Sequence, residues 1–218
     1  MKEWSDFLPY IKPHLINCPN RVIEEIVKRI VIDFCELTYA YQKDADPITL
    51  ESGVNEYSLS YTPSNFTTLS IHEVRYGDDT FVTPMMEDEL RQWKGDEWET
   101  YSGNTPQYYF LTYDNNLKIY PKPTSNTTES LYVIAIVAPT LDSTSIDDFF
   151  FDLYRPGIVE GVLYELKRMP KKDWTDLSMA GIHYDFYMSY VSKAKKRRAK
   201  SALLKPSSVK PVPFGGVN

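Results

Sequence analysis

The residue types best suited to nucleophilic or metal chemistry are few and scattered in this chain of 218 residues. His14, His72 and His183 lie far in sequence from one another and from Cys18 and Cys35. No histidine belongs to an H-x-x-x-H pattern, and none neighbours a serine in a G-x-S-x-G turn. The separation of 17 residues between the cysteines matches no zinc-ligand spacing. We therefore predict no catalytic residue, no metal site and no cofactor.

Neighbouring acidic residues do not form a convincing acid–base couple either. The acids at 78–79, 87–89 and 147–148 stand where turns or helices are expected to begin, which is an ordinary place for carboxylates. The sequence also lacks a G-x-x-x-x-G-K phosphate loop. These observations argue against an enzyme and direct attention to binding surfaces.

Charge is distributed unequally along the chain. Eight basic residues follow Ser192 with no acid among them: Lys193, Lys195, Lys196, Arg197, Arg198, Lys200, Lys205 and Lys210. The first 192 residues hold the other 16 basic residues and all 30 acidic ones, a balance of −14. An acidic body with a basic end is typical of a protein whose end meets an anionic partner. A helix end that complements its own dipole would account for only the first four of these charges.

The composition predicts a chain that folds without disulfides. Two cysteines are too few for a secreted scaffold, and the N-terminus lacks the pattern of a signal peptide, so we expect a reducing cytoplasm. The longest apolar run, residues 131–138, has eight residues, where a membrane-spanning helix needs about 20. We interpret this run as a buried strand and expect no membrane segment.

Residues 16–41 carry the most apolar helical pattern of the sequence. Its core-facing residues fall within one arc of about 100°: Ile23, Ile26, Val27, Ile30, Phe34 and Leu37. Pro19 or Asn20 is suited to begin the helix. Ile32 lies on the opposite side, and Val31 and Cys35 widen the apolar arc. We expect a helix of about 24 residues that is either the central helix of one core or packed against another subunit.

The C-terminal third predicts two further helices joined by a short turn. The first is expected to begin at Pro156 and to stop before the next proline, with Gly157 and Gly161 on one face. Because glycine inside a helix costs about 1 kcal/mol relative to alanine, we expect a close approach of another backbone there. Asp173 or Thr175 would cap the second helix. The residues nominated for packing between subunits are Ile32, Gly157, Gly161 and Trp174.

Between these helices the pattern changes to short alternating runs rich in tyrosine and β-branched residues. The predicted strands are YSLSY (57–61), TLSIHEVRY (68–76), PQYYFLTY (106–113), LKIYP (117–121) and SLYVIAIVA (130–138). Residues 77–79 and 114–116 are hairpin-turn signals, and residues 87–93 are suited to one or two helical turns.

The predicted fold class is α+β with an inserted sheet. Residues 1–48 and 145–203 would form a helical bundle from the long N-terminal helix and a C-terminal helical hairpin. Residues 49–144 would form an antiparallel β region. Residues 204–218 contain three prolines and would be an extended tail of polyproline character. This tail is either free or a docking strand that presents Lys205, Lys210, Val212, Pro213 and Phe214 to a groove.

The order of these elements resembles that of the head-to-tail adaptor, or head completion, proteins of tailed bacteriophages. Short sequence motifs between residues 4 and 199 carry the resemblance. They are Trp4, Phe7 and Leu8 before Cys18-Pro19, Phe34-Cys35-Glu36 at the end of the long helix, Tyr57-Ser58-Leu59, Gly161–Leu166 running to Met169-Pro170, and Lys172–Asp176. The basic, proline-bearing tail does not match the family pattern.

The resemblance implies a structural virion protein of the neck or tail, without catalysis and assembled in the host cytoplasm. Such adaptors form a ring, usually twelvefold, beneath the portal protein and bind a tail nozzle or tail tube protein below. Genomic DNA passes through the ring without sequence-specific binding. An acidic lumen would repel DNA phosphates, and a basic tail could anchor on an acidic portal surface.

Two other functions remain open at this point. A DNA-binding accessory protein could contact phosphates through Lys195, Lys196, Arg197, Arg198 and Lys200, although the acidic body opposes this. A tail or baseplate component could recognise a receptor or a glycan through the aromatic strands.

Overall fold

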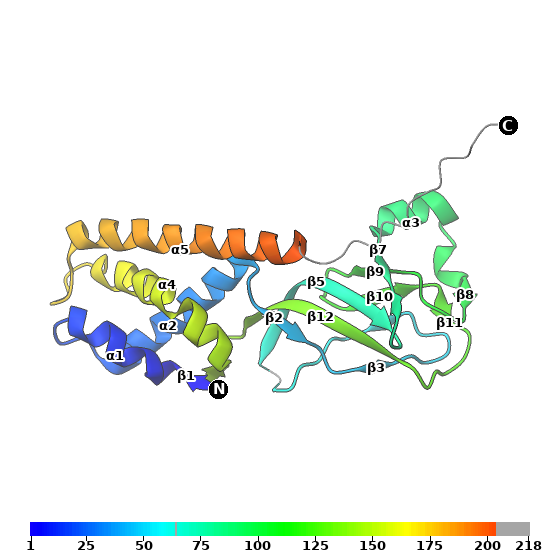
Figure 1. Cartoon of the computed structure of the whole chain (residues 1–218), viewed down its shortest axis with the longest axis horizontal. Helices are drawn as coiled ribbons and strands as arrows, with labels where there is room; N and C mark the ends of the chain where they lie inside the picture. Colours follow the sequence, from blue (N-terminus) through cyan, green and yellow to red (C-terminus); the bar gives the residue numbers. More distant parts are fainter. Residues whose placement is uncertain (64, 204–218) are drawn as a thin grey trace.

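The computed structural model describes residues 1–63 and 65–203. Its long helices gather at one end of the long axis, and most of its strands lie at the other end together with the short helix α3 (Glu87–Lys94) (Figure 1). The three long helices are α2 (Asn20–Thr38), α4 (Asp148–Lys167) and α5 (Leu177–Leu203), and each contacts the other two. The N-terminal segment packs on α2 through η1 (Trp4–Phe7) and on α2 and α4 through α1 (Leu8–Ile11), which is followed by η2 (Lys12–His14).

In the described ranges the strands form four sheets. The largest has the order β2 (Gln42–Asp44), β12 (Ser130–Pro139), β5 (Phe66–Tyr76) and β6 (Thr80–Phe81), and β3 (Ile48–Thr49) also pairs with β12. The second has the order β4 (Glu56–Tyr57), β10 (Leu117–Tyr120), β9 (Tyr108–Leu111) and β7 (Thr83–Pro84). Two pairs complete the set, β1 (Lys2–Glu3) with β13 (Ser145–Ile146) and β8 (Ser102–Gly103) with β11 (Lys122–Pro123).

The predicted α+β class is confirmed, but the strand content is larger than expected. Strands β2 and β13 lie outside the range 49–144, and the pairs β7–β9 and β8–β11 are parallel rather than antiparallel. Both hairpin turns are confirmed, since β5 pairs with β6 across residues 77–79 and β9 with β10 across 114–116. The expected short helix is α3 (Glu87–Lys94), followed by η3 (Trp98–Thr100).

Two helix boundaries differ from the prediction. α2 begins at Asn20 as expected but has 19 residues, because Tyr39 adopts a left-handed conformation (φ 52°) that ends it. α4 begins at Asp148, so that Pro156 lies inside the helix instead of starting it. The first two turns of α4 carry Phe150 and Phe151, whose burial supports the helix before the proline.

The cap of α5 was also predicted at the wrong residue. The Asp176 carboxylate accepts hydrogen bonds from the Ser178 hydroxyl at 2.7 Å and from the Met179 amide at 3.1 Å. These bonds hold the pKa of Asp176 below its ordinary value. The Thr175 hydroxyl instead donates to the Met169 carbonyl and closes the turn between α4 and α5.

α2 is the central helix of one continuous core. It contacts α4, α5, η1, α1 and β12, which explains why its apolar arc is so wide. Seven of its apolar residues are buried within the chain: Ile23, Ile26, Val27, Ile30, Val31, Phe34 and Cys35. Leu37 was expected in this core but is exposed. Of the two explanations that the sequence left open for this helix, the intrachain one accounts for these seven buried residues.

Tyr41 joins the helices to the large sheet. Its side chain is 2% exposed, and its ring centroid lies 4.6 Å from that of Phe150 in α4 and 5.4 Å from that of Phe66 in β5. Its hydroxyl donates to the Asp147 carboxylate at 2.7 Å, beside the Lys43 ammonium at 3.4 Å. Its carbonyl accepts from the Val137 amide of β12 at 2.9 Å. Burial, with the Asp147 carboxylate nearby, raises the pKa of Tyr41.

Replacing Tyr41 by Phe should lower the free energy of unfolding by about 1–2 kcal/mol, because the Asp147 carboxylate loses a partly buried hydrogen bond. Urea unfolding followed by circular dichroism measures this. Tyr113→Phe is the matched control, since Tyr113 is fully exposed and its change should lie within about 0.5 kcal/mol of zero. Equal stabilities for the two variants would contradict the role given to Tyr41.

Candidate interaction surfaces

The histidines and cysteines considered for nucleophilic or metal chemistry do not come together in one site. His14 is exposed, His72 is half-buried, and His183 is buried with Nδ1 2.7 Å from Glu160. Burial raises the pKa of the Cys35 thiol, which disfavours the reactive thiolate. Within residues 1–63 and 65–203, no group of three or more His, Cys, Asp or Glu side chains is arranged to hold a metal ion. No helix in the same ranges has the length and apolar character to cross a membrane.

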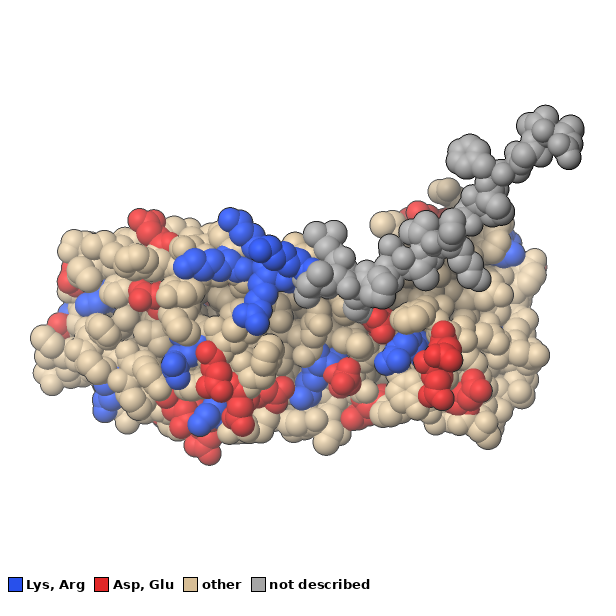
Figure 2. Space-filling view, viewed as in Figure 1, with Lys and Arg blue, Asp and Glu red and all other residues tan. Residues whose placement is uncertain are grey.

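The predicted docking residues Lys205, Lys210, Val212, Pro213 and Phe214 lie outside the described residues. The predicted basic cluster does lie on α5. Figure 2 shows Lys and Arg side chains gathered over the C-terminal part of this helix, with acidic side chains elsewhere on the same face. The cluster is nevertheless divided around the helix, because the four consecutive residues 195–198 cannot share one face.

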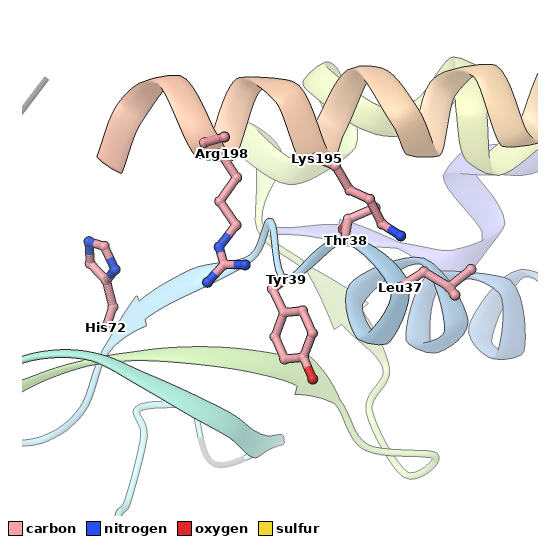
Figure 3. Close-up of a pocket in the computed structure, with 7 residues that line it drawn as sticks. Leu37, Thr38, Tyr39, His72, Lys195 and Arg198 are labelled. Atoms are coloured by element: carbon pink, nitrogen blue, oxygen red, sulfur yellow. The ribbon is translucent and has the colours of Figure 1, made fainter. Parts of the chain in front are cut away.

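Two members of the cluster face the rest of the chain. Lys195 and Arg198 line a pocket of about 520 Å³ between the end of α2, strand β5 and α5 (Figure 3). Its other lining residues are Leu37, Thr38, Tyr39, His72 and Ala199. The Arg198 guanidinium carbon lies 5.3 Å from the centroid of the Tyr39 ring, a cation–π contact between α5 and the end of α2. Arg198 therefore helps to hold α5 in place and is half-buried, whereas Lys195, Lys196, Arg197 and Lys200 are exposed.

The glycines nominated for contacts between subunits pack inside the chain. A Cβ atom on Gly157 would lie 2.7 Å from Cβ of Tyr190 in α5. A Cβ atom on Gly161 would lie 2.8 Å from Cγ2 of Ile30 in α2 and 2.9 Å from the Tyr187 ring. Both glycines are buried. The close approach was expected correctly, but the partners are side chains of the same chain, and this corrects the assignment to a subunit interface.

Ile32 and Trp174 do not form an exposed patch either. Both are half-buried and pack against the main core. The Trp174 Nε1 is buried without a hydrogen-bond partner among the described residues. Gly157 and Gly161 therefore pack inside the chain, whereas the contact of Ile32 and Trp174 with a second subunit stays a prediction.

A different set of residues is exposed and suited to contacts with a partner. Met179, Ile182 and Phe186 lie on one face of α5, at the spacing i, i+3 and i+7, and are 36%, 47% and 53% exposed. The same face continues through Lys193, Lys196 and Lys200, which are exposed. We call these six residues the α5 row. The spacing is readable in the sequence, but α5 has two apolar faces, and only the packing on α4 and α2 decides which one is buried.

On the α2 side of the same helices lies an acidic groove of about 320 Å³. Its lining residues are Ile30, Asp33, Glu36, Leu37, Tyr164, Glu165 and Tyr187. Burial raises the pKa of Asp33, with nearby Arg29 opposing and Glu165 adding to the effect. The Tyr187 hydroxyl is buried and has no hydrogen-bond partner among the described residues. Burial and the nearby Asp33 charge raise the pKa of Tyr187, so its hydroxyl stays protonated and polar.

Comparison with known proteins identifies the family. The family model described as SU10 adaptor protein matches residues 5–208. The chain belongs to the SU10 adaptor family. This confirms the resemblance to bacteriophage head-to-tail adaptors, and membership indicates a structural adaptor protein of the virion neck. No match was found among curated proteins.

The close packing of Gly161 in this adaptor can be tested by substitution. Gly161→Ala should lower the free energy of unfolding by about 1–3 kcal/mol. The added methyl group would overlap Ile30 and Tyr187, and the cost of this overlap exceeds the gain in helix propensity. Gly181→Ala in α5 is the matched control, since nothing lies within 4 Å of its added Cβ. The control should gain up to about 1 kcal/mol. Stabilisation by both substitutions in urea unfolding would show that Gly161 is not tightly packed.

Proposed function

We propose that this protein is a subunit of an adaptor ring that joins the portal to the tail of a bacteriophage. The family match supports a role in the neck of the virion. The α5 row is the observation that supports assembly into a ring. Its exposed apolar stripe of Met179, Ile182 and Phe186 would be unusual on a helix that binds no further partner. The ring is homo-oligomeric and, following the family pattern, twelvefold.

The partners in this proposal are the portal above the ring and a tail nozzle or tail tube protein below it. Genomic DNA passes through the lumen without sequence-specific binding, and the protein assembles in the host cytoplasm and performs no catalysis. The balance of −14 on residues 1–192 favours sliding of DNA past any part of this surface that lines the lumen. The basic tail docks on the portal, where Lys205 and Lys210 meet acidic groups and Val212, Pro213 and Phe214 enter a groove.

Substituting Ile182 and Phe186 by Asp should abolish ring formation on the portal while leaving the subunit folded. Both side chains are about half exposed, so each change should alter the free energy of unfolding by about 0.5 kcal/mol or less. Particle mass and symmetry are measured by electron microscopy of the protein mixed with purified portal. Phe81→Asp, an exposed phenylalanine on β6 in the sheet, is the control and should still assemble. Intact rings from the double variant would exclude the α5 row from the interface.

Truncation after Leu204 should reduce retention of the protein on immobilised portal, because the proposed anchor is removed. A full-length variant with Lys205→Glu and Lys210→Glu separates the charge from the length of the tail and should also bind more weakly, with the difference shrinking at high salt. Undiminished retention of both variants would remove the docking role of the tail.

The exposed lysines at the end of α5 also favour a second candidate, a DNA-binding accessory protein. In that case Lys196→Glu and Lys200→Glu would weaken binding to duplex DNA, and the affinity would fall steeply with added salt. A titration with duplex DNA measures this. Absence of binding at about 50 mM salt would exclude this function.

A further inference from the structure

We propose that the acidic groove of one subunit receives the lysines of the α5 row from the next subunit. This inference rests on the proposed ring and adds which two surfaces meet. The contact is head-to-tail, since a surface on one flank of the chain binds a different surface on the other flank of its neighbour. Heterologous contacts of this kind close into rings when the rotation between subunits permits.

The row and the groove lie on opposite flanks of α5, so they cannot meet within one chain. On one flank Tyr190 packs on Gly157 of α4, and the α5 row runs beside this contact. On the other flank Arg198 lies over Tyr39 at the end of α2, and the groove is lined by Ile30, Asp33, Glu36 and Leu37 of the same helix. The lysines of the α5 row therefore cannot enter the groove of their own chain, whereas a second copy carries a matching surface that can.

The charges of the two surfaces are complementary. The α5 row presents Lys193, Lys196 and Lys200 in succession along one face, with no acid on the chain after Ser192. The groove presents Asp33 and Glu36 as exposed carboxylates, and its third acid, Glu165, is already paired with Arg168 at 3.0 Å. The groove thus has two carboxylates that an incoming ammonium group can pair with.

The buried hydroxyl of Tyr187 is a second observation, independent of the complementary charges, that points to a group bound in the acidic groove. Tyr187 is 6% exposed, lines the groove and has no hydrogen-bond partner among the described residues. A buried hydroxyl without a partner is costly. A lysine ammonium has three donors, and a side-chain movement that uncovers the Tyr187 oxygen would let it bond there and to a neighbouring carboxylate at once.

Apolar residues border both surfaces in a way that fits the same contact. The groove is flanked by Leu37, which is exposed, and by Tyr164, whose ring packs on exposed Tyr184 at 5.0 Å. The α5 row has Met179, Ile182 and Phe186 in the turns before its lysines. Docking of the lysines would bring these apolar groups together and remove them from water.

The test uses two full-length variants whose charges are reversed on opposite surfaces. The row variant carries Lys193→Glu, Lys196→Glu and Lys200→Glu, and the groove variant carries Asp33→Lys and Glu36→Lys. Each alone should form at least about tenfold fewer portal-bound rings than the unmodified protein, because like charges then face each other. An equimolar mixture should restore the rings, since the acidic row fits the basic groove and the basic row fits the acidic groove in an alternating ring.

Controls separate this inference from the ring itself. Lys195→Glu changes the same charge on the same helix but on the flank towards α2, and it should assemble normally. Circular dichroism and urea unfolding confirm folding of each variant, and Glu36→Lys alone replaces the groove variant if the change at Asp33 prevents folding. Failure of the unmodified protein to form rings on the portal would overturn the proposed function and this inference with it. Normal rings from either variant alone, or none from the mixture when the unmodified protein assembles, would overturn this inference only.

Discussion

The burial of the wide apolar side of α2 is the constraint on which the rest of the structure depends. This helix contacts η1, α1, α4, α5 and β12, and its apolar residues at 23, 26, 27, 30, 31, 34 and 35 all lie in the core. Tyr41, just beyond its end, extends the same core into the large sheet through its contacts with Phe66, Phe150 and Asp147. Helices and sheet are therefore one packed body, and the position of each surface relative to the others follows from this helix.

The packing of α5 on that body explains why an apolar face is left over. Gly157 and Gly161 let α5 approach α4 until Tyr190 and Tyr187 lie against the backbone of α4. This close approach buries one face of α5, including Ala180, His183, Tyr187, Val191 and Ala194. The adjacent face, with Met179, Ile182 and Phe186, is left exposed within residues 1–63 and 65–203. In the proposed ring, a neighbouring subunit would cover this face.

Charge has a different role from the one that the net value suggests. The acidic body and the basic end do not neutralise each other within one subunit, because Lys196 and Lys200 point away from the body while Lys195 and Arg198 face it. A subunit with a basic flank and an acidic flank is electrostatically suited to bind its own copy in one orientation and to reject the reverse orientation. This asymmetry favours a ring over a symmetric pair of subunits.

The sequence by itself determined the α+β class, the helix beginning at Asn20, the hairpins around residues 77–79 and 114–116, and the family. These features depend on local periodicity, turn chemistry and short sequence motifs. Tertiary structure decided the rest. Pro156 lies inside α4 because the burial of Phe150 and Phe151 supports the turns before it. Gly157 and Gly161 pack inside the chain, whereas Phe186 is exposed. A periodic pattern specifies that a face is apolar but not which neighbour covers it. The acidic groove brings Asp33 of α2 close to Glu165 of α4 and Tyr187 of α5, and only the folded chain places residues so distant in sequence around one cavity.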